Sequence, residues 1–183
     1  FLALACAQVR VIELDEMLRS LSYHLTGDSL PLASLEEVIE TYFPLEPTPA
    51  RGVYDHAICT HGSTPERNFA KAADNDNEVV CFLKLPEFYE IPTPIGMYRP
   101  DFGLVLKRRS LRDGTEGEYY FVIETKSTNN IDDPRALTET ERLKIKCAMK
   151  HFDAIGVAAK VDYRLYHAPV KDYQPDLKDR LTV

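Results

Sequence analysis

Three charged residues, Asp101, Glu124 and Lys126, have the residue types and spacing of a hydrolytic site. Asp101 follows Pro100 and begins the apolar run DFGLVLK, and Glu124-Thr125-Lys126 ends a second apolar run, YYFVIETK. Because side chains alternate along a strand, Glu124 and Lys126 lie on the same face of the second run. An unpaired buried charge is costly, so we expect this strand to end in a polar cleft or beside a charged partner.

An antiparallel hairpin of the two runs would bring Asp101 and Glu124 together, because the start of one strand then lies beside the end of the other. Two neighbouring carboxylates repel unless a cation lies between them. Mg²⁺ prefers oxygen ligands and usually takes one or two carboxylates with water and phosphate oxygens. Lys126 should stay protonated beside two acids, where it would orient water and stabilise a charged transition state. This set suits phosphodiester hydrolysis, and an exposed ion pair at a sheet edge is the structural alternative.

Glu66 is a further candidate, on a helix expected from Thr64 to about Asp74 with Thr64 as its N-cap. Glu66 shares one face of this helix with Phe69, Ala70 and Ala73. It therefore points where the apolar residues point, toward the core. The alternative is an acid in the first turn that complements the helix dipole.

Three basic residues, Arg142, Lys146 and Lys150, recur every four positions on a helix expected from Glu139 onward. This stripe flanks the buried face of the helix, and it is a candidate for phosphate contacts with DNA. A solvated charged face is the alternative. His151 lies on the other flank, and we interpret it as a structural histidine.

The elements around these residues follow the order helix, strand, strand, strand, helix, strand. YYFVIETK is apolar on both faces until its end, which is typical of a central strand covered on both sides. Thr138 and Glu141 form a capping box at the start of the second helix, which we expect to end at Gly156. The predicted elements are a strand over Val53–Thr60, the helix from Thr64, strands Glu78–Leu85, Asp101–Lys107 and Tyr119–Lys126, the helix to Gly156, and a strand over Val161–His167.

The N-terminal part is predicted to be a helical extension, residues 1–52, ahead of a main domain, residues 53–183. An apolar stripe at helical spacing runs from Val11 to Leu25, and Gly27 is placed at the helix end. Ser34 and Glu37 predict a second helix over Leu35–Phe43. A Pro-rich linker then leads to Gly52.

The chain of 183 residues has 22 Lys and Arg against 29 Asp and Glu, a formal net charge of −7. This balance disfavours a basic coat for nucleic acid, but it leaves room for a local DNA-binding patch. No apolar run approaches the length of a membrane span. The four cysteines lack metal-ligand spacing, so we expect buried or free thiols. The first residue is Phe1, which suggests a piece of a longer polypeptide.

Several linked motifs resemble the C-terminal nuclease domain of the restriction (Res) subunit of type III restriction enzymes. They are LPEFYEIPTPIGMYRPDFGLVL, YYFVIETKS and ERLKIKCAMKHFDAIG, and the resemblance covers roughly residues 54–156. It implies an α/β PD-(D/E)xK fold with a mixed central sheet flanked by helices. It also implies that Asp101, Glu124 and the carbonyl of Thr125 bind Mg²⁺, that Lys126 is the catalytic lysine and that Glu66 leans into the metal site. The family often has Gly where this chain has Ser127.

The resemblance also implies partners: double-stranded DNA, an ATP-driven helicase motor in the same full-length subunit, and a methyltransferase subunit. It places the protein in the cytoplasm of a bacterium or archaeon. Two other hypotheses stay open. One is a catalytically silent DNA-binding or docking module of the same fold, and the other is a nuclease of repair or recombination.

Overall fold

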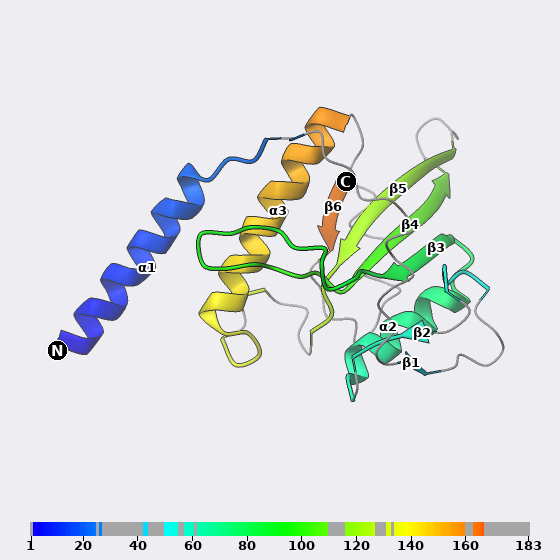
Figure 1. Cartoon of the computed structure of the whole chain (residues 1–183), viewed down its shortest axis with the longest axis horizontal. Coiled ribbons are helices and arrows are strands. Elements are labelled where there is room, and N and C mark those ends of the chain that lie inside the picture. Colours follow the sequence, from blue (N-terminus) through cyan, green and yellow to red (C-terminus); the bar gives the residue numbers. More distant parts are fainter. Residues whose placement is uncertain are drawn as a thin grey trace.

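The computed structural model describes residues 2–24, 26, 42–43, 50–54, 57–60, 62–109, 116–126, 131–132, 134–159 and 163–166. Three helices and six strands lie within these residues (Figure 1). In chain order they are α1 (Leu2–Ser20), β1 (Tyr42–Phe43), β2 (Ala57–Ile58), α2 (Thr64–Asn75), β3 (Val79–Lys84), β4 (Phe102–Arg109), β5 (Glu116–Ile123), α3 (Glu139–Ala159) and β6 (Tyr163–Tyr166).

The main sheet has four strands in the order β3-β4-β5-β6. β3, β4 and β5 are antiparallel neighbours, whereas β6 joins β5 in parallel after the crossover through α3. The predicted order from α2 to β6 is therefore confirmed, and so is the hairpin of the two apolar runs. Its register pairs Phe102 with Ile123, which brings the start of β4 beside the end of β5.

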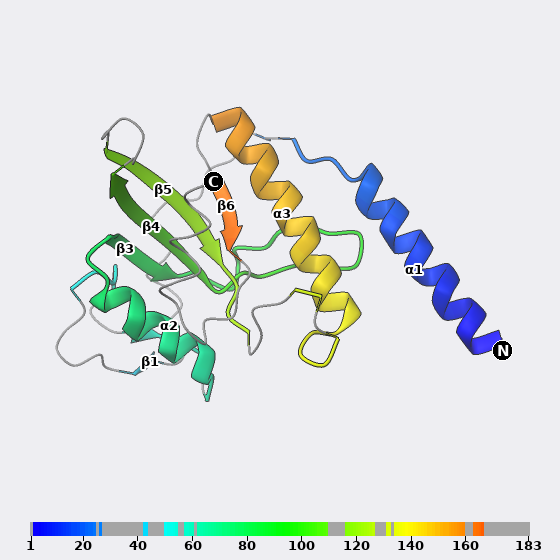
Figure 2. The same cartoon turned by 180° about the vertical axis from the view of Figure 1, so that it is seen from behind.

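The sheet is covered on both faces, as the composition of β5 predicts. Figures 1 and 2 show α2 on one face and α3 on the other. Phe121 and Ile123 pack with the buried face of α2, while Val122 packs with α3. Successive residues of β5 thus enter two separate cores, and the strand is fixed from both sides.

The two main helices begin much as the sequence predicts. Ser63, not Thr64, is the N-cap of α2, because its side chain accepts the backbone N–H of Glu66 and Pro65 stands in the first turn. Thr138 caps α3 together with Glu141, whose carboxylate accepts the Thr138 N–H at 2.9 Å. α3 continues through Gly156 to Ala159, so the predicted end of this helix is wrong.

The N-terminal helix is shorter than the apolar stripe predicts. α1 ends at Ser20 rather than near Gly27, and Lys150 of α3 donates hydrogen bonds to the carbonyls of Leu18, Arg19 and Leu21. These contacts satisfy carbonyl groups at the end of α1, where the helix itself supplies no partner.

Three further predictions of element boundaries need correction, and two of them lie partly outside the described residues. Tyr42–Phe43 forms β1, which excludes the end of the second predicted helix, whereas residues 35–41 lie outside the described part of the chain. Of the strand expected over Val53–Thr60, the described residues form a strand at β2, Ala57–Ile58, and residues 55–56 lie outside the described part of the chain. β5 ends at Ile123, so Glu124, Thr125 and Lys126 lie just after the strand, whereas the sequence predicts them as its last residues.

A long loop, residues 85–101, joins β3 to β4 and reaches across α3 toward α1 (Figure 1). Tyr23 ties the segment after α1 to this loop, because its hydroxyl donates to the carbonyl of Pro92 at 2.8 Å. All four cysteines are free thiols, and Cys59 and Cys147 are buried. Among the described residues, no helix is both long enough and apolar enough to cross a membrane.

Candidate active site

Asp101 is fixed at the open end of the β4–β5 hairpin by backbone and side-chain hydrogen bonds. Its N–H donates to the carbonyl of Ile123 at 3.0 Å, and its carbonyl accepts the N–H of Leu85 at 2.9 Å. Its carboxylate oxygen Oδ2 accepts the backbone N–H and the hydroxyl of Thr125, each at 2.7 Å. Thr125 therefore orients Asp101 directly.

Glu124 and Lys126 meet just beyond the end of β5. Glu124 is 6% exposed, and its Oε1 lies 3.1 Å from Lys126 Nζ. The other oxygen, Oε2, accepts the hydroxyl of Tyr98 at 2.8 Å. Lys126 also contacts Oε1 of Glu141 at 3.2 Å, so the ammonium lies between two carboxylates.

Glu66 points into the molecule, as the face of α2 predicts. It is 5% exposed and buried together with Phe69, Ala70 and Ala73. Its Oε2 accepts the N–H of Thr60 at 2.7 Å and contacts Lys84 Nζ at 2.8 Å. The side chain thus faces other charged residues of the site and not only the first turn of its helix.

Lys84 is a central member of the site that the sequence analysis missed. Its ammonium bridges Glu66 and Asp101, the latter at 3.1 Å from Oδ1. A signal was present, because Lys84 lies two residues after Phe82, a core residue packed with α2. By strand alternation, both side chains share the face of the sheet that α2 covers.

Tyr98 and Glu141 were also missed as site residues. Tyr98 is buried in the long loop, where a bridge between Ile91 and Tyr98 holds the backbone. Nothing in the local sequence indicates that its hydroxyl reaches Glu124. The sequence indicates Glu141 only as a capping residue, but its side chain has two roles. Its Oε2 caps α3, and its Oε1 contacts Lys126.

The pKa values follow from this network of burial and charge. Burial, helped by the negative charge of Asp101, raises the pKa of Glu124 to about 7 even though Lys126 and Tyr98 oppose the shift. Burial also disfavours the charge of Lys126, but Glu124 and Glu141 outweigh it and raise the pKa of the lysine. Lys126 is therefore protonated at neutral pH, as its position between acids predicts.

The pKa of Lys84 depends on the same two opposing effects, burial and neighbouring carboxylates. Burial works against the charge of Lys84, yet Asp101 and Glu66 outweigh it and raise its pKa. Glu66 responds in the opposite sense: burial alone would raise its pKa, but Lys84 and the hydrogen bond from Thr60 lower it. The two groups are thus charged partners.

Asp101 and Glu124 are the carboxylates of the site that could hold a divalent cation. No three acidic, His or Cys side chains within the described residues are placed to form a metal cluster. Mg²⁺ needs fewer, because it commonly takes one or two carboxylates and completes its shell with water. Asp101 and Glu124 offer carboxylate oxygens of this kind, and burial together with the charge of Asp101 raises the pKa of Glu124, so its ionised form would gain from an added cation.

A pocket of about 390 Å³ opens beside Glu124 and Lys126. The long loop and α3 form its other walls. Lys144 donates to the carbonyl of Met97 at 2.9 Å, which ties α3 to the loop at this point. The lining residues are Met97, Tyr98, Arg99, Glu124, Lys126, Glu141, Lys144 and Ile145.

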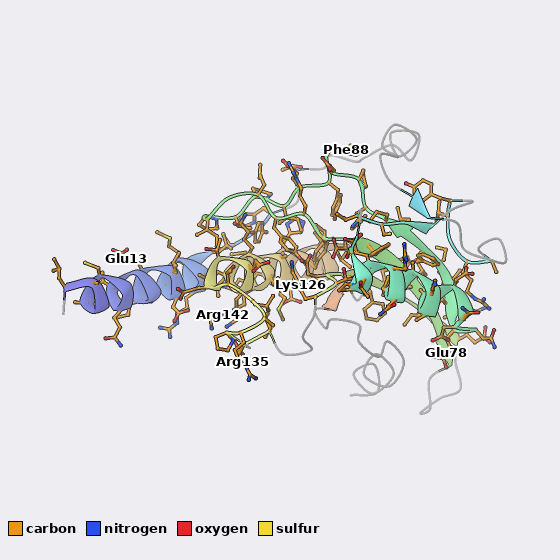
Figure 3. All side chains as sticks on the ribbon, turned by 90° about the horizontal axis from the view of Figure 1, so that it is seen from below. Glu13, Glu78, Phe88, Lys126, Arg135 and Arg142 are labelled. Atoms are coloured by element: carbon orange, nitrogen blue, oxygen red, sulfur yellow. The ribbon has the colours of Figure 1, made fainter. Side chains whose placement is uncertain are left out.

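The basic stripe of α3 does not converge on this pocket. Arg142 and Lys146 contact Asp132 at 3.4 and 3.3 Å, and Lys150 holds the end of α1. In Figure 3 Lys126 lies between α3 and the sheet, while Arg142 projects from the side of α3. A role of these residues in DNA binding stays a prediction.

His151 has a structural setting. Its ring packs edge-on against Tyr23 and Phe152, with centroid separations of 4.9 and 5.1 Å. Its Nδ1 is buried with no hydrogen-bond partner among the described residues. The contact with Tyr23 joins α3 to the segment after α1.

Comparison with known proteins adds one match. Residues 50–168 match a family model described as an endonuclease domain. No curated protein matches the chain, and no solved structure does.

Proposed function

The chain belongs to the endonuclease-domain family, and on that basis we propose that it is a Mg²⁺-dependent deoxyribonuclease that hydrolyses backbone phosphodiesters. The observation that carries the proposal is the meeting of Asp101, Glu124 and Lys126 at the open end of one hairpin. Thr125 links the two halves of this set, because it donates two hydrogen bonds to Asp101 and lies between Glu124 and Lys126 in sequence.

In the proposed reaction, water attacks phosphorus, a new P–O bond forms, and the bond from phosphorus to one sugar oxygen breaks. The proton that water loses is balanced by the proton that the released sugar oxygen takes up from solvent. Bound Mg²⁺ would supply positive charge to the phosphate and acidify the attacking water. Asp101, Glu124 and the Thr125 carbonyl are the groups proposed to hold it. Tyr98 keeps one oxygen of Glu124 in place. Lys126 keeps its proton beside Glu124 and Glu141, so it acts as a hydrogen-bond donor to water or phosphate and not as a base.

We further propose that the chain has the PD-(D/E)xK fold and is the nuclease domain of a type III restriction enzyme. The support is the linked run of sequence motifs and the helix-strand-strand-strand-helix-strand order. The substrate would be double-stranded DNA. A motor in the same full-length subunit and a methyltransferase subunit would be its partners.

The test is cleavage of supercoiled plasmid by the purified chain, with Mg²⁺ and with EDTA. We expect cleavage only with Mg²⁺, and its loss in Glu124→Gln. Glu116→Gln is the matched control, because Glu116 lies on the same strand but is exposed and pairs with Lys107. Equal cutting by wild type and Glu124→Gln would refute the proposed site. DNA binding without cutting by the wild type would favour the silent module instead.

A further inference from the structure

Lys84 reaches the site from a third strand and is held there on several sides. Its Nζ lies 2.8 Å from Glu66 Oε2 and 3.1 Å from Asp101 Oδ1. β3 pairs Lys84 opposite Phe102, and the Phe102 ring centroid lies 4.9 Å from Nζ. The side chain is 18% exposed. The strand register therefore places an ammonium group between two carboxylates.

The formal charge of the site favours the binding of one divalent cation over two. The charged groups form two ion-paired sets, Glu66–Lys84–Asp101 and Glu124–Lys126–Glu141, each with a formal charge of −1, which gives −2 in total. One divalent cation would neutralise it. A second would leave an excess of positive charge in a largely buried network, where uncompensated charge is costly.

We propose that Lys84 takes the place of a second metal ion between Glu66 and Asp101, so that the site binds a single divalent cation. This inference rests on the metal-dependent function proposed above. In this arrangement Glu66 pairs with Lys84, because its Oε2 accepts both the Lys84 ammonium and the Thr60 N–H. The metal then belongs to the side of the network formed by Asp101 and Glu124.

The test counts bound metal and does not depend on cleavage. Mn²⁺ is titrated into the full chain in 0.15 M KCl, which screens weak binding to exposed acids, and free Mn²⁺ is measured by electron paramagnetic resonance. We expect one Mn²⁺ per wild-type chain. We expect two in Lys84→Met, because Glu66 and Asp101 lose the cation between them and the formal charge of the site falls to −3, so that one divalent cation no longer neutralises it. The double variant Lys84→Met/Glu66→Gln should return to one.

Lys107→Met is the matched control. It removes one lysine from the neighbouring strand, where Lys107 pairs with Glu116 at 3.0 Å away from the site, so the count should stay at one. Circular dichroism and thermal melting establish that each variant is folded. If Lys84→Met does not fold, Lys84→Gln replaces it, since the amide is neutral yet can still donate to both acids.

The outcomes separate this inference from the proposed function. Two Mn²⁺ per wild-type chain, or an unchanged count in the folded Lys84 variant, would overturn the role of Lys84 while Mg²⁺-dependent cleavage still stood. One Mn²⁺ in the wild type and two in the variant, without any cleavage, would support Lys84 and count against the nuclease proposal. No Mn²⁺ in the wild type would remove the metal site and the inference together.

Discussion

Asp101 and Glu124 differ in how the protein compensates their charges. Asp101 accepts two hydrogen bonds from Thr125 and contacts Lys84. Glu124 is buried more deeply, and its pKa is raised to about 7 by burial and by Asp101. Glu124 is therefore the carboxylate whose ionised form gains most from an added cation.

We expect Glu124→Gln to melt at or above the wild-type temperature in EDTA at pH 8. The amide keeps the size of the side chain and can still accept the Tyr98 hydroxyl, but it removes a buried charge that Asp101 repels. Mg²⁺ should then raise the melting temperature of the wild type and not of the variant. Scanning calorimetry with and without Mg²⁺ measures both effects. A clear loss of stability in EDTA would show that the ion pair with Lys126 outweighs the repulsion.

Tyr98 is expected to act on cleavage through Glu124. Tyr98→Phe removes the hydroxyl that holds Glu124 Oε2 at 2.8 Å and leaves the ring in the core. A hydrogen bond to a charged group contributes about 1.5 kcal/mol or more, so we expect cleavage to slow about tenfold. The effect should fall on kcat, with KM for DNA unchanged.

Tyr120→Phe is the control for that experiment, because it removes a hydroxyl that donates to the exposed Glu118 at 3.1 Å. A wild-type kcat in Tyr98→Phe would show that the role of Glu124 in cleavage does not depend on this hydroxyl. A matching loss in both variants would point to a general effect on the sheet.

At the level of elements, the sequence predicts the hairpin of β4 and β5, but it does not predict what the neighbouring strand β3 contributes to the site. Alternation and two-sided apolar character are local properties of DFGLVLK and YYFVIETK, and they define the pairing that joins Asp101 to Glu124. The role of Lys84 depends on the register of β3 against β4 and on the position of α2, which are tertiary properties. Tyr98 reaches the site from a loop with no periodic pattern at all.

The end of α1 illustrates a second limit of sequence reasoning. The apolar stripe continues to Leu25, yet the helix stops at Ser20, where Lys150 from a distant helix takes the free carbonyls. The sequence offers Lys150 as a candidate for phosphate contacts with DNA, with a solvated charged face as the alternative. A basic stripe on a helix does not reveal whether its partner is a phosphate, a carboxylate or the end of another helix.

We therefore expect Lys150→Met to loosen α1 and to leave DNA affinity unchanged. The side chain donates to the carbonyls of Leu18, Arg19 and Leu21, and without it the helix end loses charged hydrogen bonds. Hydrogen exchange in residues 17–23 should become at least several-fold faster. Lys146→Met is the control for the exchange measurement, because Lys146 contacts the exposed Asp132 and not the end of α1. Weaker DNA binding in Lys150→Met with unchanged exchange would restore the predicted phosphate contact.

The described part of the whole chain presents one set of catalytic candidates on one sheet. The set lies where β4 begins and β5 ends, with α2 on one side and α3 on the other (Figures 1 and 2). The sequence shows no internal repeat that would supply a second set. The geometry of a DNA duplex then determines how many strands one copy of this chain can cleave at a time.

One copy is expected to cut one strand at a time. The two strands of a duplex run antiparallel, so one rigid site cannot address both scissile phosphates in the same geometry, and a double-strand break needs two copies or two visits. In a dilution series with supercoiled plasmid, nicked circles should appear first and in proportion to protein. If two copies meet only on DNA, linear DNA should follow later and rise more steeply than protein concentration. Linear product without a nicked precursor, formed in strict proportion to a chain shown to be monomeric, would mean that the single set of Asp101, Glu124 and Lys126 serves both strands.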